Sequence, residues 1–426
     1  MHRESKPRAA RALQAATVAV FCLLVAGFGV ATAAGGVHLV ASGSAEAESY
    51  VHTVQLGPCT VGLDFKDESA MEKRELAQFP VPTLAEVADG TFQEQFEAFL
   101  EDQFAGRDAW VTLKTAFEVR VLGKTESNDI YIGSGGYLIE KYTDADFEED
   151  QVAENVEALA AFANMVSGAM GPDAVRVVMV PGKANALPSY LPAYAQSSTA
   201  QQEMKDALCA QLDNADSVFL DLTETLQAHE DEYIYYRTDH HWTTLGAYYG
   251  YEQIMASLGT EVDAYESYEP EAVTSEFLGT SYNNVHYATQ ADEITRIHTT
   301  AGDAATMVID DSGDIVQADS IYDEDALAGD DPYTYFMSGN YGQITVHTGC
   351  ANGKTLFIVK DSYANCLVPY LAEQYETIVM LDVRYLNDNV STCISNSVDA
   401  LDENVNILIL FNEEKFMQDT HSYLLN

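Results

Sequence analysis

The chain has few basic residues. Among its 426 residues, 21 are Lys or Arg and 67 are Asp or Glu, which gives a formal net charge of −46 at pH 7. A surface this acidic repels nucleic acid and anionic lipid headgroups, so we expect no nucleic-acid partner. Diffuse cation binding is compatible with this charge, but a solvated acidic surface is the simpler interpretation. Because 47% of the residues are hydrophobic, the chain can still bury one large core or two smaller ones.

Cysteine is also scarce, and its spacing carries no metal or redox motif. None of the six cysteines forms a Cys-x-x-Cys pair and the ten histidines are scattered, so the sequence predicts no structural zinc site, no other metal and no cofactor. Cys22 lies in an apolar N-terminal run, which leaves an odd number of cysteines beyond it. The spacing leaves open whether these cysteines form two disulfide bridges, one or none.

Two common functional motifs are absent. The Gly-x-Ser-x-Gly elbow of α/β-hydrolases does not occur, which argues against that superfamily. The glycines at 133, 135 and 136 are not followed by Lys-Ser or Lys-Thr, and no helix is expected to begin there. Residues 130–139 are therefore predicted to form a β-hairpin rather than a phosphate-binding loop.

The N-terminus has the pattern of a membrane or export segment. Four basic residues between positions 3 and 11 precede an apolar run from about 12 to 34, which is long enough to cross about 30 Å of hydrocarbon as a helix. Residues 1–36 are therefore predicted to be a cytoplasmic tip and a signal anchor, with a single pass through the cell membrane and everything after residue 36 outside the cytoplasm. Ala-Thr-Ala at 31–33 also fits a signal-peptidase site, so a cleaved signal peptide and a secreted protein remain the alternative.

Beyond this segment the sequence predicts an α/β domain. Residues 37–63 are small and polar and are predicted to be a stalk, and residues 64–426 to be the domain. Continuously apolar strands occur in turn with helices along the sequence, which indicates a mostly parallel sheet with helices on both faces. The predicted elements are helices at 152–169 and 200–212 and strands at 175–180, 217–222, 355–359, 378–381 and 405–410. Residues of about 262–335 are acidic and Tyr-bearing without long periodicity, and are predicted to be an insertion that shapes an acceptor groove.

Two motifs predict a catalytic site. Asp239-His240-His241 and Lys360-Asp361-Ser362-Tyr363 together supply the residues of a Ser-His-Asp triad, in which His takes the Ser proton and Asp orients the His. Asp239 and His241 are two positions apart, so in an extended segment both side chains lie on one side and that of His240 points away. Ser362 follows the strand at 355–359, and open α/β sheets bind ligands at the carboxyl ends of their strands.

Each of these residues has a simpler alternative. Asp361-Ser362 also suits a helix N-cap. A metal site at the Asp-His-His tripeptide lacks further identifiable ligands. Asn340 and the backbone at Tyr363 are candidate oxyanion donors, although a Gly-Asn turn also explains Asn340. Lys360 and Arg384 are candidates to orient an anionic substrate, with solvated strand-edge charges as the alternative.

The motif pair also resembles a known family. Asp-His-His-Trp at 239–242, followed by a Lys-Asp-Ser turn at 360–362, resembles the DHHW-motif family of extracytoplasmic bacterial proteins, relatives of the alginate O-acetylation proteins in the SGNH-hydrolase superfamily. Further similar segments lie at 72–76, 104–108, 131–133, 338–340 and 382–385. The resemblance implies an SGNH-like, flavodoxin-like fold with a Ser-His-Asp acyl-transfer site and a permuted order, in which Asp-x-His precedes Ser. Residues 277–282 resemble a family segment near the active site, which makes Gly279 a candidate substrate-orienting residue, although a turn before a hairpin also explains them.

The function that these features predict is extracytoplasmic O-acetyl transfer to a cell-surface or exported polysaccharide. Acetyl-CoA is not expected outside the cell, so the resemblance implies a membrane-bound O-acyltransferase as the partner that relays the acetyl group. Two alternatives stay open: a carbohydrate acetylesterase with the same triad, and a non-catalytic glycan-binding scaffold of an export complex.

Overall fold

The structure is a computed structural model that describes residues 37–41, 52–56, 59–63, 65–69, 71, 74–80, 83–195, 198–311, 313–397 and 404–425. Contacts divide the chain into two compact units, Met1–Phe117 and Glu118–Asn426. The predicted membrane segment at 1–36 lies outside the described residues. Among the helices that the structure does describe, none is long and apolar enough to cross a membrane.

The first unit contains strands in the range predicted to be a stalk. β1 (Val37–Ala41), β2 (His52–Leu56) and β3 (Cys59–Leu63) form an antiparallel sheet in the order β1-β3-β2. The remaining elements are β4 (Glu68–Ser69), β5 (Arg74–Glu75), α3 (Leu84–Asp89), α4 (Thr91–Gln103) and α5 (Arg107–Arg120), which runs across the boundary between the units. The stalk at 37–63 and the start of the domain near residue 64 stay predictions. The division by contacts falls after Phe117.

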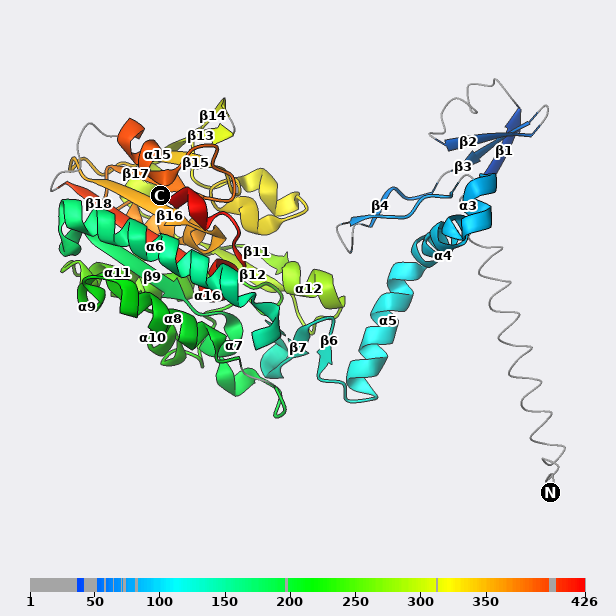
Figure 1. The fold of residues 1–426 in the computed structure, drawn as a ribbon, viewed down its shortest axis with the longest axis horizontal. Coiled ribbons are helices and arrows are strands. Elements are labelled where there is room, and N and C mark those ends of the chain that lie inside the picture. Colours follow the sequence, from blue (N-terminus) through cyan, green and yellow to red (C-terminus); the bar gives the residue numbers. More distant parts are fainter. Residues whose placement is uncertain are drawn as a thin grey trace, which may run out of the picture. The chain divides into compact units, whose positions relative to one another are not determined.

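An eight-stranded sheet forms the centre of the second unit (Figure 1). Its order is β10 (Phe219–Asp221), β9 (Val175–Val180), β18 (Val405–Asn412), β16 (Thr355–Lys360), β17 (Thr377–Leu381), β15 (Gln343–His347), β13 (Thr306–Asp311) and β14 (Asp314–Ala318). The first five strands are parallel, and β15, β13 and β14 continue the sheet antiparallel. The prediction of a mostly parallel α/β sheet is confirmed.

The strand order differs from the flavodoxin order that was expected. The last strand of the chain, β18, lies between β9 and β16, whereas the flavodoxin order would place it at an edge. All of the last six residues of β18 are buried. Its long apolar run is therefore covered on both faces, as a central strand requires.

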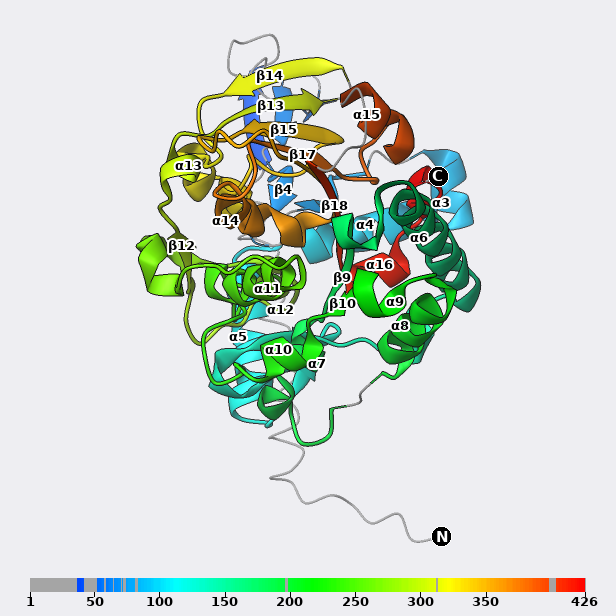
Figure 2. The ribbon, with the colours of Figure 1, turned by 90° about the vertical axis from the view of Figure 1, so that its left-hand side faces the viewer.

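Side chains that alternate along the parallel strands feed two hydrophobic cores. Val177 and Met179 of β9 lie in the core under α6 (Glu149–Met170) and α8 (Ala200–Gln211). Val178 and Val180 lie in the core under α11 (Thr244–Ser257). Figure 2 shows α6 and α8 on one side of the sheet and α11 on the other, so the predicted helices on both faces are confirmed.

One predicted strand is wrong in part. The strand expected at 217–222 begins as α9 (Ala215–Val218), because the Asn214 carbonyl accepts from the N–H groups of Ser217 and Val218, and only Phe219–Asp221 pair as β10. The predicted insertion at 262–335 contributes β13 and β14 to the central sheet. It also contains the ladder of β11 (Glu271–Phe277) and β12 (Asp292–Arg296), the helices α12 (Thr280–Val285) and α13 (Thr300–Asp303), and short 3-10 helices.

The hairpin predicted at 130–139 is confirmed. β7 (Ile130–Ile132) pairs antiparallel with β8 (Leu138–Glu140) across a glycine-rich turn, and β6 (Glu126–Ser127) pairs with β7. The other short helices of this unit are α7 (Lys183–Ala186), α10 (Thr223–Gln227), α14 (Val368–Leu371), α15 (Val390–Ser397) and α16 (Glu413–Gln418).

Two consecutive carboxyl groups are buried where β18 passes into α16. Glu413 forms an ion pair with Lys205 at 2.8 Å, and Glu414 Oε1 accepts from Gln201 Nε2 at 3.4 Å. The Gln201 Oε1 atom beside it is buried without a hydrogen-bond partner among the described residues. Burial, and after it the charge of Glu413, raises the pKa of Glu414 to about 7.

Glu414→Gln is therefore expected to increase stability at alkaline pH. The folded chain holds a proton on Glu414 between pH 4.5, its ordinary pKa, and about 7, so the free energy of unfolding falls as pH rises through this range. One pH unit corresponds to about 1.4 kcal/mol, so the variant should gain about 3 kcal/mol over the wild type at pH 8 and little at pH 5. Urea unfolding at both pH values measures this, with Glu157→Gln on the exposed face of α6 as the control. A difference that does not change with pH would contradict the expectation.

Candidate active site

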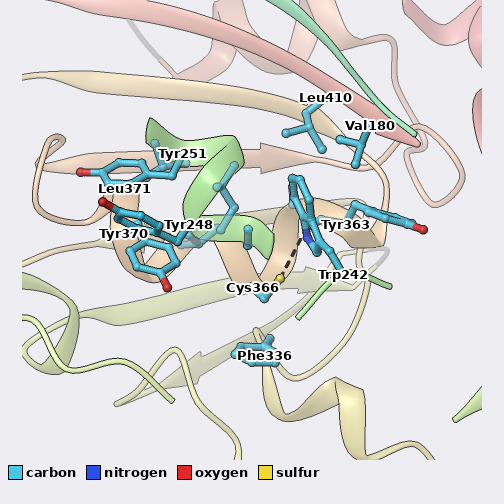
Figure 3. Close-up of a cluster of buried hydrophobic side chains, with 14 of the residues drawn as sticks. Val180, Trp242, Tyr248, Tyr251, Phe336, Tyr363, Cys366, Tyr370, Leu371 and Leu410 are labelled. Carbon is cyan, nitrogen blue, oxygen red and sulfur yellow. Dashed lines mark hydrogen bonds between the residues drawn. The ribbon is translucent and has the colours of Figure 1, made fainter. Parts of the chain in front are cut away.

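The Asp-His-His-Trp segment is held in a loop directly before α11. Thr243 caps this helix by accepting from the Gly246 N–H, and Trp242 pairs with Tyr235 in an antiparallel bridge. Trp242 is fully buried, and its Nε1 donates to the carbonyl of Tyr363 at 2.9 Å. Figure 3 shows Trp242 beside Tyr363 and Cys366 in a cluster of buried side chains. The indole therefore ties the histidine loop to the segment that carries Ser362.

Ser362 begins a short 3-10 helix, η8 (Ser362–Leu367), at the carboxyl end of β16. Asp361 is its N-cap, and Asp361 Oδ1 accepts from the Tyr363 N–H at 2.9 Å. Asp361 Oδ2 accepts from the N–H of Asn412 at the end of β18 at 2.7 Å. Burial raises the pKa of Asp361, although Arg384 and these N–H groups oppose the rise. The N-cap interpretation of Asp361 is confirmed, and Ser362 lies beside it at the expected end of the sheet.

The structure brings Ser362, His241 and Asp239 together. His241 Nε2 lies 2.7 Å from Ser362 Oγ, and His241 Nδ1 lies 2.6 Å from Asp239 Oδ1. Asp239 is 1% exposed, His241 5% and Ser362 9%. With a carboxylate on one ring nitrogen, the proton is placed on Nδ1 and Nε2 is left to accept from the Ser362 hydroxyl, which is the arrangement that general-base activation needs.

Asp239 is stabilised as a carboxylate. Its Oδ2 accepts from the Thr280 N–H at 2.8 Å and from Thr280 Oγ1 at 3.0 Å, at the start of α12. Burial alone would raise the pKa of Asp239, but His240, His241 and the hydrogen bonds hold it well below its usual value. Asp239 is therefore ionised throughout the physiological pH range and able to orient His241.

His240 does not point away from its neighbours, contrary to the expectation for an extended segment. Its ring centroid lies 3.9 Å from that of His241, and its Nδ1 lies 2.7 Å from Thr280 Oγ1. The chain bends here instead of running as a strand, which removes the alternation of sides. Burial, and next the charge of His241, holds the pKa of His240 well below its usual value.

Asp239, His240 and His241 also offer possible metal-ligand atoms within 4.8 Å of one another. Hydrogen bonds already occupy both carboxylate oxygens of Asp239 and both ring nitrogens of His241. These bonds account for the arrangement, and the absence of a metal stays a prediction.

Gly279 lies against the side chain of Asp239 rather than an open substrate site. A Cβ at this position would lie 2.3 Å from both Cβ and Oδ2 of Asp239. Its N–H donates to Thr238 Oγ1 at 3.1 Å. The predicted substrate-orienting role therefore does not fit these contacts, and Gly279 allows Asp239 to approach the start of α12.

Gly279→Ala is expected to lower the rate of acyl transfer about 10²-fold, because a displacement of Asp239 by about 1 Å disturbs the alignment of His241. The measurement is kcat on an activated acetyl ester, together with the melting temperature to show that the variant folds. Gly168→Ala on α6 is the matched control, since a Cβ there meets nothing within 4 Å. Equal rates for both variants would count against this role of Gly279.

The two oxyanion candidates differ in their contacts. Asn340 Oδ1 accepts from Lys360 Nζ at 2.8 Å and from Asn365 Nδ2 at 3.2 Å, while the structure shows no hydrogen bond from Asn340 Nδ2 to any residue it describes. The amide is thus oriented with a free donor, as an oxyanion site requires. The Tyr363 N–H instead donates to Asp361, so the predicted oxyanion role of Tyr363 does not agree with its contacts.

Lys360 and Arg384 are arranged differently from either sequence interpretation. Lys360 is fully buried and donates to Asn340 and Asn365, with Asp382 Oδ2 3.5 Å away. It is neither a solvated charge nor exposed to substrate, and burial lowers its pKa against the opposing effect of Asp382. Arg384 forms a bidentate pair with Asp382 through Nε and Nη2 at 2.8 and 2.6 Å, and its side chain is 32% exposed.

Tyr333 contacts both His241 and the Ser362 backbone and was not identified from the sequence. It lies on the 3-10 helix η7 (Pro332–Tyr335) within the range expected to be an insertion. Its ring stacks on that of His241 at 3.8 Å and 8°, and its hydroxyl donates to the carbonyl of Ser362 at 3.2 Å. The sequence suggested only that this region is rich in tyrosine, so no signal distinguished this one.

Tyr333→Leu is expected to lower kcat about 10-fold with little change in KM. The aromatic face restricts rotation of the His241 ring and attracts the positive charge that develops on it in the transition state, an effect of about 1.4 kcal/mol. Tyr333→Phe keeps the ring and should keep most of the rate. Steady-state kinetics of both variants test this, and a Phe variant as impaired as the Leu variant would assign the effect to the hydroxyl instead.

The fold and the site together define an α/β protein with a Ser-His-Asp arrangement at the carboxyl end of its central strands. A family model described as DHHW protein matches residues 155–381, more than half of the chain. The chain belongs to the DHHW family. No curated protein matches it.

Solved structures show the same fold. A DHHW family protein from Eubacterium siraeum is 24% identical, with a TM-score of 0.56 over 70% of this chain and 95% of that protein. Bacillus cereus PatB1 with a sulfonyl adduct is 20% identical, with a TM-score of 0.52 over 66% of this chain and 99% of PatB1. The O-acetyltransferase domain of Pseudomonas putida AlgJ is 14% identical, with a TM-score of 0.40 over 68% of this chain and 92% of that domain. The first two structures have TM-scores above 0.5 but are less than 25% identical to this chain, so they establish the fold and no more.

Proposed function

We propose that this protein is an extracytoplasmic O-acetyltransferase that acetylates a cell-surface or exported polysaccharide through Ser362, His241 and Asp239. The observation that carries the proposal is the pair of contacts at His241, 2.7 Å to Ser362 Oγ and 2.6 Å to Asp239 Oδ1. A serine hydroxyl held in this way gains the base it needs to attack an acyl carbon.

In the first half of the reaction, Ser362 Oγ attacks the carbonyl carbon of an acetyl donor and its proton passes to His241 Nε2. The C–O bond to the donor's leaving group then breaks, and His241 returns the proton to that group. Asn340 Nδ2 and the Ser362 N–H donate to the oxyanion of the tetrahedral intermediate. The product of this half is an acetyl ester on Ser362.

In the second half, a sugar hydroxyl of the acceptor attacks the acetyl ester while His241 takes its proton. The bond to Ser362 Oγ breaks, and His241 donates the proton back to that oxygen. Asp239 stabilises the imidazolium that forms in each half. Ser362 is only 9% exposed, and limited access of water favours transfer to a bound hydroxyl over hydrolysis.

The location and the acetyl donor are part of the same proposal. The basic and then apolar N-terminal sequence supports an anchored or exported protein with its domain outside the cytoplasm. A donor must reach this domain without acetyl-CoA, so we include a membrane-bound O-acyltransferase as the relay partner. The acceptor is a polysaccharide, whose apolar ring faces and hydroxyl groups suit a chain with 25 tyrosines.

Acetylation in the producing cell tests the proposal. Cells that lack the protein, complemented with wild type or with Ser362→Ala, are compared for ester-linked acetate on the surface and exported polysaccharide. We expect acetate to return with the wild type only. Equal acetate with both would overturn the catalytic role of Ser362, whereas an increase in acetate on deletion would identify a carbohydrate acetylesterase. Tight glycan binding without any change in acetate would identify a scaffold.

A further inference from the structure

A pocket of about 410 Å³ lies on the other side of Asp361, at the carboxyl ends of the central strands. Its wall includes Asp361, Arg384 and Tyr385, from the ends of β16 and β17. Its polar lining also includes Lys415 of α16, Gln418, and the segment Asp419, Thr420 and His421. None of the contacts described for acyl transfer uses Lys415, Tyr385 or His421, so their arrangement needs another explanation.

The carboxylates around this pocket are already paired. Asp361 accepts from two backbone N–H groups, those of Tyr363 and Asn412. Asp382 is fully buried between Arg384 and Lys360. Asp419 Oδ2 accepts from the backbone N–H of His421 at 3.1 Å, and Asp419 Oδ1 lies 3.2 Å from His421 Nδ1. Each of these carboxylates is therefore held by donors of the protein itself.

The donors around the pocket are not all used. Asp382 occupies Nε and Nη2 of Arg384 and holds the guanidinium in place, which leaves Nη1 without a hydrogen bond to the described residues. Lys415 makes no ion pair with any residue that the structure describes in this unit. The other lysine of the second unit for which this holds is Lys354, which is exposed at the opposite, amino end of β16. Two cationic side chains in one concavity, each with donors to spare, are uncommon in a chain with 67 acidic residues and only 21 Lys and Arg.

An aromatic ring lies beside these donors. Tyr385 is 50% exposed, although it lines a pocket, and the Arg384 guanidinium lies 5.5 Å from the centre of its ring. A half-exposed aromatic face beside charged donors suits a ligand that has both a flat apolar face and an anionic group. Sugars that carry a carboxylate or a phosphate ester have both.

We propose that this pocket binds an anionic sugar, with its carboxylate or phosphate oxygens on Arg384 Nη1 and Lys415 Nζ and its ring on Tyr385. Asp361 lines the pocket, and Ser362 is the next residue of the chain. The bound sugar is therefore a unit of the acceptor polysaccharide that neighbours the unit that is acetylated. This last clause rests on the proposed function, whereas the binding site itself does not. Most of this acidic protein repels an anionic polymer, so a local pair of cationic side chains would determine where such a polymer binds.

Binding to the full-length chain, kept in a nonionic detergent, tests the proposal. Titration calorimetry compares oligogalacturonate, glucose 6-phosphate and neutral cello-oligosaccharide on the wild type, on Lys415→Gln and on the matched Lys354→Gln variant. We expect saturable binding of an anionic ligand that weakens about 10-fold in Lys415→Gln, is unchanged in Lys354→Gln and falls with added salt, since a charge-assisted hydrogen bond contributes about 1.5 kcal/mol. The anion that binds more tightly identifies the group as carboxylate or phosphate.

Three results would overturn the proposal: no binding of either anion, equal binding of the neutral oligosaccharide, or equal losses in the two lysine variants. Arg384→Lys adds a second test, because it keeps the charge but cannot hold both Asp382 and a ligand in the same geometry. The same titrations on Ser362→Ala separate this site from the chemistry. Anion binding by a wild type that forms no acetyl-enzyme would support the binding site and overturn the proposed function. A wild type that forms the acetyl-enzyme but binds neither anion would overturn the binding site and leave the proposed function in place.

Discussion

Ser362→Ala is expected to lower kcat for acetyl transfer by about 10⁶-fold, the largest effect of any single substitution in this chain. Without Oγ no acetyl-enzyme forms, and the residual rate comes from binding and the oxyanion donors alone. Because Ser362 Oγ contacts His241 Nε2, the variant leaves a histidine without a nucleophile to activate. Initial rates of acetate release from an activated acetyl ester measure the loss.

The control for this variant is Ser395→Ala on the exposed face of α15, which removes the same group away from the site and should keep the wild-type rate. A Ser362→Ala protein that retains a tenth of the rate would show that another residue carries the acetyl group. Cys366, which is buried four residues along the same helix, would then be the first candidate to examine.

Asp239→Asn is expected to lower kcat by about 10⁴-fold while leaving the fold intact. Asp239 accepts from His241 Nδ1 at 2.6 Å, and an amide that turns its NH₂ toward this nitrogen favours the tautomer whose Nε2 carries the proton. That tautomer cannot accept from Ser362. The exposed Asp314→Asn on β14 makes the same chemical change outside the site and should have no effect.

The loss in Asp239→Asn should be equally large at pH 5 and pH 8. The pKa of Asp239 in the folded protein is held well below its usual value. The stability that its charge contributes is therefore fully present above the pKa of the unfolded chain, and it is lost only as pH falls through the lower pKa of the folded protein. The carboxylate is therefore present at both pH values. Kinetics that converge with the wild type at pH 5 would show instead that Asp239 is protonated there.

The parts of this molecule that follow from local pattern were predicted well. The strands at 175–180, 355–359, 378–381 and 405–410 are apolar runs that only a doubly covered sheet can bury, and all four are present. Asp239, His241 and Ser362 were predicted as a triad from their residue types, and the structure brings them together. Their two motifs are 121 residues apart at the His241 to Ser362 contact, and the position after a strand places one of them at the expected end of the sheet.

The rest depends on contacts that no local pattern encodes. A lysine such as Lys360 is usually a surface charge. Here it is buried against Asn340 and Asp382, and the fold brings these three residues together from three separate segments. Gly279 resembled a substrate contact, and only the packing of α12 shows that it accommodates Asp239. Tyr333 is one of 25 tyrosines, and its stacking on His241 results from the path of the chain after β14.

The most direct test of a Ser362 acyl-transfer site is the intact mass of the full-length protein after brief incubation with an activated acetyl ester. The account predicts one added acetyl group on the wild type, mapped to the peptide that contains Ser362, and none on Ser362→Ala or His241→Ala. Acetyl addition to Ser362→Ala at the wild-type level would contradict it. So would a wild type that releases acetate from the ester with no dependence on either residue.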